Sequence, residues 1–445
     1  MAKLGKTAVV AGRSMGGLAA AAALSKSFEN VVIIDRDPSG PGVDKRPGVG
    51  QGHHLHLLQR GGELAAERLL PGTRVDLIAA GAVEVTASID GRFYDHGYWL
   101  PQRDLGFTNL SATRWLMEQV VRERLLREPG VSVRSNSTLS DIVIDEGGSV
   151  TGVAFTNGEG VSETLDADLV VDCTGRGSKV RALLVAHGYD EVPEFNINMG
   201  ISYTSALMNA PADALGTDKN LVVLPNPPHK RGAFVAKVEG GNWLVSLHTR
   251  FEKDLPKTYA EMLAFASGIE VPDVAEFLEK ASLAGEIRSY RKPDATWRRF
   301  DRLERFPERL LALGDAVTSF NPVYGQGMSV ALMQACALND ILEARSAGSV
   351  GLDGLAREFF PKAKEISGEA WNSSTLVDAA YEEVTGDTPR GSEQSLTFVR
   401  AVRTLLATDP SLHADYVGIG QMVNPNTVLF SRDRVARVMA AAAKL

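Results

Sequence analysis

The spacing of apolar and polar positions predicts that strands and helices alternate at the start of the chain. Residues 7–11 are apolar, as in a buried strand, and the glycine-rich turn 12–17 separates them from a helix-forming run at 18–24. A second apolar strand covers residues 31–34 and ends at Asp35. This order predicts a βαβ unit with two parallel strands.

Other segments follow the period of strands with one buried face. Residues 83–100 and 195–250 alternate apolar and polar side chains, which predicts an antiparallel sheet. Residues 361–445 are mostly helical, with breaks near Pro389 and Pro410. The chain therefore combines a nucleotide-binding pattern, a second sheet and a helical end.

The predicted fold class is mixed α/β, because parallel and antiparallel patterns occur in one chain. At 445 residues the chain is too long for a single core. We expect a discontinuous Rossmann-like dinucleotide-binding domain from residues 1–80, 101–185 and 300–360, an antiparallel-sheet domain from 81–100 and 186–299, and a helical C-terminal region over 361–445.

Composition narrows the classes of partner. The chain has 47 basic and 55 acidic residues and a net charge of -8, which argues against nucleic acid because a phosphate-binding surface needs a basic excess. Cys173 and Cys336 lie in apolar surroundings and are expected to be buried thiols. No apolar run approaches the roughly 20 residues of a membrane span and no signal-peptide layout is seen, so the expected location is the cytoplasm.

The first glycine-rich turn has the residues that a bound pyrophosphate requires. Gly12 permits a tight turn, and Gly17 lets the helix pack closely on the strand. Ser14 stands where the dinucleotide fingerprint has its middle glycine, and its hydroxyl can donate to a phosphate. Asp35 can accept hydrogen bonds from an adenosine ribose. The residues predicted to hold FAD or NAD here are Gly12, Ser14, Met15, Gly17, Asp35 and Arg36.

A second turn of this kind lies late in the chain. The apolar strand 310–313 runs into Gly314-Asp315-Ala316, and a helix follows residues 321–328. A carboxylate at the strand end can bind a ribityl hydroxyl, and the helix N-terminus can direct its partial positive charge at a flavin ring. The predicted contacts are Asp315, Pro322, Gly325, Gly327 and Met328.

Residues 313–328, Leu-Gly-Asp-Ala-Val-Thr-Ser-Phe-Asn-Pro-Val-Tyr-Gly-Gln-Gly-Met, resemble the second FAD motif of the flavoprotein monooxygenases of the para-hydroxybenzoate hydroxylase fold. Together with the first turn, this resemblance implies FAD as the cofactor. Residues 168–181 resemble the middle motif of that family, with Thr174 in place of its aspartate. The family ties this motif to FAD and NAD(P)H binding, which implies electrons from NAD(P)H, directly or, given Thr174, through a separate flavin reductase.

Two further stretches extend the resemblance. Arg114 opens the predicted helix 115–126, where the family has an arginine that reaches the ribityl and phosphate region of FAD. Residues 45–56, Lys-Arg-Pro-Gly-Val-Gly-Gln-Gly-His-His-Leu-His, and residues 297–302 are similar to flavin epoxidases of the polyether and squalene-epoxidase-like type. The additional candidates are Arg46 and Gln51 for FAD binding, and His54 and His56 near the ring.

His54 and His56 would share one face if this stretch were a strand. Two histidines alone do not make a metal site, and no further ligands accompany them. No metal is therefore predicted.

The resemblance implies an oxidoreductase that inserts one oxygen atom of O2. Reduced FAD would form a C4a-hydroperoxide that passes oxygen to a hydrophobic, electron-rich small molecule by epoxidation or hydroxylation, as in secondary metabolism. The antiparallel-sheet domain would supply a dry substrate pocket. Its candidate lining residues are Phe93, Tyr94, Trp99, Tyr203 and Trp243. The flavin would carry the chemistry, and no catalytic side chain is assigned.

Three alternatives stay open from the sequence. An FAD-dependent reductase or dehydrogenase of the geranylgeranyl-reductase type would carry the same two FAD motifs and differ in oxygen reactivity. A flavin-dependent halogenase fits less well, because that family has a tryptophan just after the first fingerprint, where Leu18 stands here. A non-catalytic flavin- or NAD-binding protein would bind the cofactor without turnover.

Overall fold

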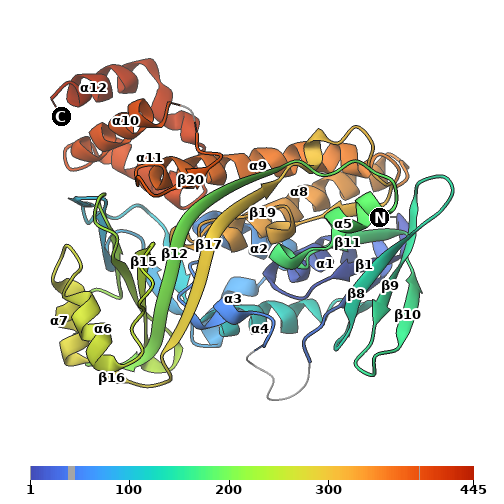
Figure 1. Ribbon diagram of the computed structural model, residues 1–445, viewed down its shortest axis with the longest axis horizontal. Coiled ribbons are helices and arrows are strands. Elements are labelled where there is room, and N and C mark those ends of the chain that lie inside the picture. Colours follow the sequence, from blue (N-terminus) through green and yellow to red (C-terminus); the bar gives the residue numbers. More distant parts are fainter. Residues whose placement is uncertain (1, 39–45, 390, 445) are drawn as a thin grey trace.

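The computed structural model of the protein describes residues 2–38, 46–389 and 391–444. Lys45, the first residue of the stretch 45–56, lies outside the described residues. Figure 1 shows two halves joined by long strands, with helices along one side and at one end. The mixed α/β fold class predicted from the sequence is confirmed.

A parallel five-stranded sheet organises the half that contains the N-terminus. Its order is β18 (Leu310–Ala312), β11 (Leu169–Asp172), β1 (Gly5–Ala11), β2 (Phe28–Ile34) and β7 (Val131–Arg134). β1 lies at the centre because residues 8–11 are apolar on both faces and fully buried. Ala11 pairs with Asp172, which in turn pairs with Ala312. The turns that follow β1, β11 and β18 therefore lie side by side at the carboxyl end of the sheet.

Helices α1 (Met15–Ser25) and α8 (Gly327–Ala347) begin at two of these turns and pack against each other. α1 is rich in alanine, and its small side chains let it lie close to β1 and β2. The other helices of this half are α2 (Arg60–Leu69), α3 (Thr73–Ala79), α4 (Arg114–Leu125) and α5 (Val180–Ala186). Two small antiparallel sheets complete it: β8 (Thr138–Ile144), β9 (Val150–Thr156) and β10 (Ser162–Asp166), and the pair β3 (Val83–Thr86) and β6 (Thr108–Ser111).

A ten-stranded sheet forms the second half. Its main order is β19 (Thr318–Ser319), β17 (Arg288–Arg298), β12 (Glu194–Asn209), β15 (Trp243–Arg250), β14 (Gly232–Lys237), β13 (Asn220–Leu224), β4 (Gly91–Asp95) and β5 (Tyr98–Trp99), and β16 (Ser282–Leu283) and β20 (Thr385–Gly386) pair with β12. All pairs are antiparallel except β13 with β4. Figure 1 shows β12 and β17 running side by side from one half into the other.

The ten-stranded sheet is covered on both faces, and β15 shows this most clearly because all of its residues are buried. Trp243, Val245 and Leu247 belong to the core beneath α6 (Tyr259–Ala266) and α7 (Asp273–Lys280). The side chains that alternate with them, among them Ser246 and His248, face the first half of the molecule. The sheet thus separates an apolar core from a polar layer.

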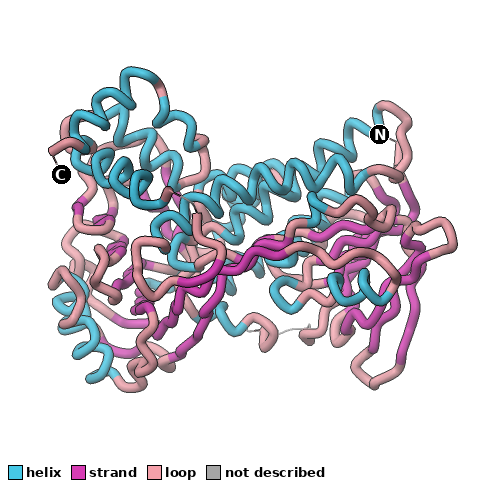
Figure 2. The backbone as a smooth tube through the Cα atoms, turned by 45° about the horizontal axis from the view of Figure 1, so that its top comes forward, coloured by secondary structure: helices cyan, strands magenta, loops and turns pink. Residues whose placement is uncertain are grey.

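The C-terminal helices extend away from both sheets. α9 (Leu355–Asp378) packs along α8, whereas α10 (Ser392–Leu405), α11 (Pro410–Gly420) and α12 (Arg432–Ala442) share a small core of their own. Figure 2 places these three helices at the end of the molecule opposite the N-terminus. Among the described residues, none of the helices combines the length and apolar character needed to cross a membrane.

Candidate functional site

A cavity of about 620 Å³ opens where the three motif turns leave the parallel sheet. Turns from β1, β11 and β18 form one wall, and side chains from β12 and β17 contribute to another. Of the residues predicted from the sequence, the lining includes Gly12, Ser14, Met15, Asp35, Arg36, Arg46, Gln51, His54, His56, Arg114, Asp315, Pro322, Gly325, Gly327 and Met328. Of the residues predicted to contact FAD or to lie near its ring, only Gly17 is absent from the lining.

Gly17 lies behind the cavity and sets how closely α1 approaches β1. A Cβ atom on Gly17 would stand 1.9 Å from the backbone oxygen of Gly12. Gly12 has φ +98°, and a Cβ there would stand 2.4 Å from the oxygen of Cys173. Backbone atoms block side chains at both positions, so the turn can only be built from glycine. It leaves Ser14, Met15 and Gly16, at the N-terminus of α1, facing the cavity.

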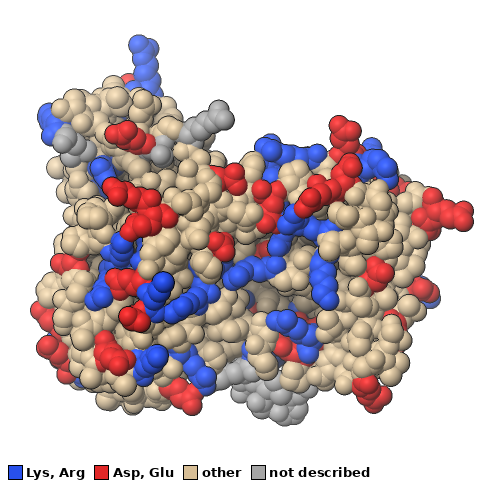
Figure 3. All heavy atoms as spheres, in the orientation of Figure 1, with Lys and Arg blue, Asp and Glu red and all other residues tan. Residues whose placement is uncertain are grey.

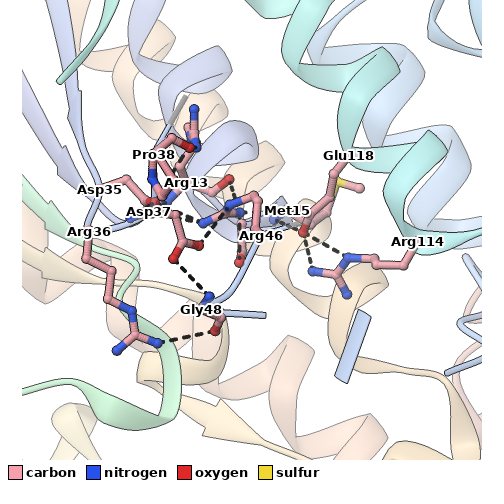
Figure 4. A network of polar contacts seen from close by, with 11 residues as sticks. Arg13, Met15, Asp35, Arg36, Asp37, Pro38, Arg46, Gly48, Arg114 and Glu118 are labelled. Carbon is pink, nitrogen blue, oxygen red and sulfur yellow. Dashed lines mark hydrogen bonds and ion pairs between the residues drawn. The ribbon is translucent and has the colours of Figure 1, made fainter. Parts of the chain in front are cut away.

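Asp35 directly follows β2, and both oxygens of its carboxylate accept hydrogen bonds (Figure 4). Its carboxylate accepts hydrogen bonds from the backbone N–H of Arg13 at 2.7 Å and of Asp37 at 2.9 Å. It also accepts from Nη2 of Arg46 at 3.0 and 3.1 Å. A ribose hydroxyl at this carboxylate would therefore share it with Arg46 or displace the guanidinium.

Arg46 extends this network to α4. Its guanidinium lies 3.2 Å from Asp37 and 3.3 Å from Glu118, and all three side chains are buried. Glu118 also accepts a hydrogen bond from Nε of Arg114 at 2.8 Å (Figure 4). Burial alone would raise the pKa of Glu118, but Arg114 and Arg46 overcome it and hold the pKa below its usual value. Sequence reasoning missed Glu118, although its i+4 spacing from Arg114 on a helix could have indicated the pair.

The second motif turn places Asp315 opposite a buried lysine. Lys292 comes from β17, lines the cavity and donates to the backbone oxygen of Asp294. Burial lowers the pKa of Lys292 to about 8, and Asp315 opposes that shift. Burial raises the pKa of Asp315, and Lys292 opposes that shift in turn. The sequence offered no signal for Lys292, since it is one of several charged residues on an alternating strand.

Asp378, the last residue of α9, anchors the loop of the second motif. Its Oδ1 accepts hydrogen bonds from Nδ2 of Asn321 at 2.8 Å, the Tyr324 hydroxyl at 3.0 Å and Nη2 of Arg250 at 2.7 Å. Asp378 is 0% exposed and Arg250 is 3% exposed. Burial alone would lower the pKa of Arg250, but Asp378 raises it above its usual value. Three distant segments thus fix the loop that precedes Gly325 and Gly327.

The middle motif is held together by Asp172 at the end of β11. Its carboxylate accepts hydrogen bonds from the backbone N–H of Thr174 at 3.0 Å and from the hydroxyls of Thr174 and Ser178. Burial raises the pKa of Asp172, and these hydrogen bonds oppose the shift. Arg176 and Lys179 follow in this turn, where they are exposed and line the cavity. On the face of the molecule drawn in Figure 3, basic side chains gather around a central hollow.

His54 and His56 both line the cavity, but they do not lie on a strand. A short 3-10 helix over Gly50–His53 precedes them, and the backbone then runs extended without a pairing strand. Burial lowers the pKa of His54 to about 4 and that of His56 to about 3, so both rings are neutral near pH 7. Among the described residues, no group of three or more histidine, cysteine or acidic side chains is placed to hold a metal ion.

Of the five residues proposed to line a pocket on the second sheet, only Tyr203 lies at the cavity. The expectation for Trp243 is wrong, because it packs on Phe277 in the core beyond the sheet. Tyr94 packs against that same core, and Trp99 is 43% exposed. Phe93 contacts the main core but not the cavity.

Three converging turns with these features define a dinucleotide-binding protein of the flavin type. Residues 6–358 match the FAD binding domain family, and the chain belongs to that family. It is 30% identical over 392 residues to protein Rv3254 of Mycobacterium tuberculosis, covering 85% of this chain and 81% of the relative. It is 23% identical to squalene epoxidase 6 of Arabidopsis thaliana, covering 86% of this chain and 71% of that protein.

Solved structures show the same fold. The flavin-dependent brominase Bmp2 matches with a TM-score of 0.69 at 13% identity, over 99% of this chain and 98% of the brominase. PqsL of Pseudomonas aeruginosa, described as a probable FAD-dependent monooxygenase, matches with a TM-score of 0.63 at 17% identity, over 84% and 97%. The predicted resemblance to FAD-dependent monooxygenases of the para-hydroxybenzoate hydroxylase fold is confirmed, and the chain is an FAD-binding oxidoreductase.

Proposed function

We propose that this enzyme uses FAD to insert one oxygen atom of O2 into a hydrophobic, electron-rich small molecule, by epoxidation or hydroxylation, in secondary metabolism. The observation that carries the proposal is the composition of the cavity. One wall consists of the three flavin-motif turns, and another carries Tyr203, Tyr290 and Lys292 from the ten-stranded sheet. A flavin held by the first wall would have room for a substrate beside its ring.

The residues of the first wall fit FAD in order along its length. Asp35 would hold the adenosine ribose, and the N-terminus of α1 at Met15 would face the pyrophosphate. Asp315 would bind the ribityl chain. Gly325 and Gly327 would lie against the ring, where the N-terminus of α8 favours negative charge. The crowded backbone at Gly12 and Gly17 supports this assignment, because such close packing leaves room for phosphates at the turn.

Water must be kept from the reacting centre, because the activated oxygen is otherwise lost as peroxide. When bound and reduced, FAD would supply the two electrons that activate O2, and O2 would supply the transferred oxygen atom. The apolar side chains of Leu55, Leu57, Phe320 and Met328 line the cavity and would exclude water around the ring. The neutral His54 and His56 add polar contacts without adding charge.

Electrons would come from NAD(P)H, either directly or through a separate flavin reductase. NADH and NADPH are both anions, and Arg176 and Lys179 present positive charge at the cavity. Anaerobic mixing of the oxidised holoenzyme with NADPH or NADH distinguishes the two routes. Rapid bleaching of the flavin would indicate direct reduction, and bleaching only with an added reductase would indicate a partner.

The main test is rapid mixing of the anaerobically reduced holoenzyme with O2 while the flavin absorbance is followed. We expect a transient spectrum distinct from both reduced and oxidised flavin, and incorporation of one atom of 18O2 into product. Direct return to oxidised flavin with every candidate substrate would favour a reductase or dehydrogenase of the geranylgeranyl-reductase type. A halogenated product in the presence of bromide or chloride would contradict oxygen insertion as the final step.

A further inference from the structure

A row of polar side chains covers the cavity-facing side of the ten-stranded sheet. Tyr203 pairs with His248 on β15 and with Tyr290 on β17, and Ser205 pairs with Ser246. Because side chains alternate along a strand, Tyr203 and Ser205 project to the same face of β12. This face meets the stretch that carries His54, whose ring lies 5.6 Å from that of Tyr203.

A continuous chain of hydrogen bonds fixes the His54 ring. The backbone N–H of Leu55 donates to Oγ of Ser246 at 2.8 Å. Oγ of Ser246 lies 2.6 Å from Oγ of Ser205, which lies 2.7 Å from Nδ1 of His54. The amide at one end can only donate, so Ser246 accepts from it and keeps its own proton for another acceptor.

The protons of the two hydroxyls can be ordered from that amide toward His54. Ser246 accepts from Leu55 and gives its own proton to Ser205, and Ser205 gives its proton to Nδ1 of His54. Either order leaves one proton unpaired among the described residues: the reverse order leaves it on Ser246, which does not line the cavity, and this order leaves it on Nε2 of His54, which does. In this order Nδ1 is an acceptor and the ring proton of neutral His54 is on Nε2, where a ligand in the cavity can accept it.

Two buried donors that line the cavity at this wall, on His54 and Tyr203, lack partners. His54 and Tyr203 are 4% and 5% exposed, and both line the cavity. Among the described residues, none forms a hydrogen bond with Nε2 of His54 or with the Tyr203 hydroxyl. Burial lowers the pKa of His54 to about 4 and raises that of Tyr203, so each keeps one proton to donate at neutral pH. Buried donors are normally satisfied, and these two point to an acceptor that the ligand brings.

We propose that Nε2–H of His54 and the hydroxyl of Tyr203 donate hydrogen bonds to an oxygen atom of the substrate. The inference rests on the proposed function and narrows its substrate class to hydrophobic molecules that bear a phenolic, enolic or carbonyl oxygen. A pure hydrocarbon would cover both donors and leave them unpaired. Each unpaired donor should weaken binding by about tenfold or more. The substrate rather than the flavin is the expected acceptor, because His54 is held by Ser205 and Ser246 of the ten-stranded sheet.

The tautomer of His54 tests the first step without any substrate. Nitrogen NMR of the holoenzyme labelled at histidine reports which ring nitrogen carries the proton, and His54→Gln assigns the signal. We expect protonated Nε2 in the parent and a mixture of tautomers in Ser205→Ala, which removes the donor to Nδ1. A proton on Nδ1 in the parent would overturn the proposal.

Matched probes test the substrate class. Binding of 2-naphthol against naphthalene, and of farnesal against farnesene, is measured from the change in absorbance of bound, oxidised FAD. We expect the oxygen-bearing member of at least one pair to bind about tenfold or more tightly, and His54→Phe and Tyr203→Phe each to reduce that preference. Thr204→Val is the matched control, because Thr204 also loses a hydroxyl but lies between Tyr203 and Ser205 on the opposite face of β12.

Three outcomes overturn the proposal. The first is that naphthalene and farnesene bind as tightly as 2-naphthol and farnesal. The second is that no oxygen-bearing probe binds. The third is that the preference for oxygen-bearing probes survives in both His54→Phe and Tyr203→Phe. A fourth contradicts the assignment to substrate: His54→Phe changes the affinity for FAD and the spectrum of the free holoenzyme, which would make the flavin the acceptor. The reaction of the reduced enzyme with O2 is measured without substrate, so failure here and failure of the proposed function are distinguishable.

Discussion

Replacing Asp378 by alanine should both destabilise the protein and loosen its hold on FAD. The carboxylate binds Arg250, Asn321 and Tyr324 at 2.7, 2.8 and 3.0 Å. Its removal leaves Arg250, 3% exposed, without a counter-ion among the described residues. Breaking a buried ion pair by deleting one partner costs about 3–5 kcal/mol, because a buried charge is left uncompensated. We therefore expect a loss of at least about 3 kcal/mol in the free energy of unfolding.

The effect on FAD follows from the two loop contacts. Asn321 and Tyr324 would lose the acceptor that fixes the loop before Gly325. A lost hydrogen bond is worth about 1 kcal/mol, so FAD should bind about five- to tenfold more weakly. Urea denaturation gives the stability, and titration of the apoprotein with FAD gives the dissociation constant.

Two variants make the reasoning refutable. Asp353→Ala removes a carboxylate from a pair with Arg309 that is 66% and 35% exposed, and it should cost less than about 1 kcal/mol. Combining Asp378→Leu with Arg250→Met removes both buried charges and should recover about 2 kcal/mol of the loss. The reasoning fails if Asp378→Ala costs no more than Asp353→Ala, or if the double variant is as unstable as the two single losses added together.

Three further predictions concern the cavity. Gly17→Ala should prevent FAD binding, since its Cβ would stand 1.9 Å from the oxygen of Gly12. The control Gly420→Ala, in α11 and outside the cavity lining, meets nothing within 4 Å and should bind FAD; equal flavin-to-protein ratios in the two variants would contradict this. Asp35→Ala should lower FAD retention on gel filtration, and unchanged retention would count against the adenosine assignment. Lys292→Met should stabilise the protein by about 1–3 kcal/mol below pH 8. Burial lowers the folded-state pKa of Lys292 to about 8, so below that pH the folded protein bears the full cost of its buried charge. That cost disappears as the pH rises from 8 toward 10.5, the usual pKa of lysine. If urea denaturation shows the same stability difference between parent and variant throughout this pH range, the prediction for Lys292 is refuted.

The flavin-motif turns could be predicted from sequence because each depends on local geometry. Gly12 and Gly17 are required by backbone atoms within one strand-turn-helix unit, and Asp35 and Asp315 stand at strand ends where position follows from the strand itself. Such features leave a local pattern of residue types. The parallel register then brings the turns together.

The supporting residues could not be predicted, because their roles arise from tertiary contacts. Asp378 lies 57 residues from Asn321 and 128 from Arg250 along the chain. Lys292 became part of the cavity only through the pairing of β17 with β12. Neither contact has a fixed sequence spacing that a pattern could show.

The error at Trp243 has a different origin. Alternation along β15 correctly indicates two faces, but it does not say which face meets the cavity. In a sheet with one solvated face, the polar side chains mark the face that meets solvent. Here all of β15 is buried, and the apolar face packs on α6 and α7 while the polar face carries Ser246 and His248 toward the cavity. The more hydrophobic face was therefore the wrong choice for the pocket.

The long pair of β12 and β17 limits how the enzyme can be recombined. β12 spans 16 residues. Its first residue, Glu194, pairs with Arg298 at the end of β17, and its last, Asn209, pairs with Ser282 of β16. A chimaera that exchanges the ten-stranded sheet between relatives would cut a continuous ladder if its crossover fell within 194–209 or 288–298. The two strands must therefore come from the same parent protein, and crossovers are best placed in the loops on either side of the pair.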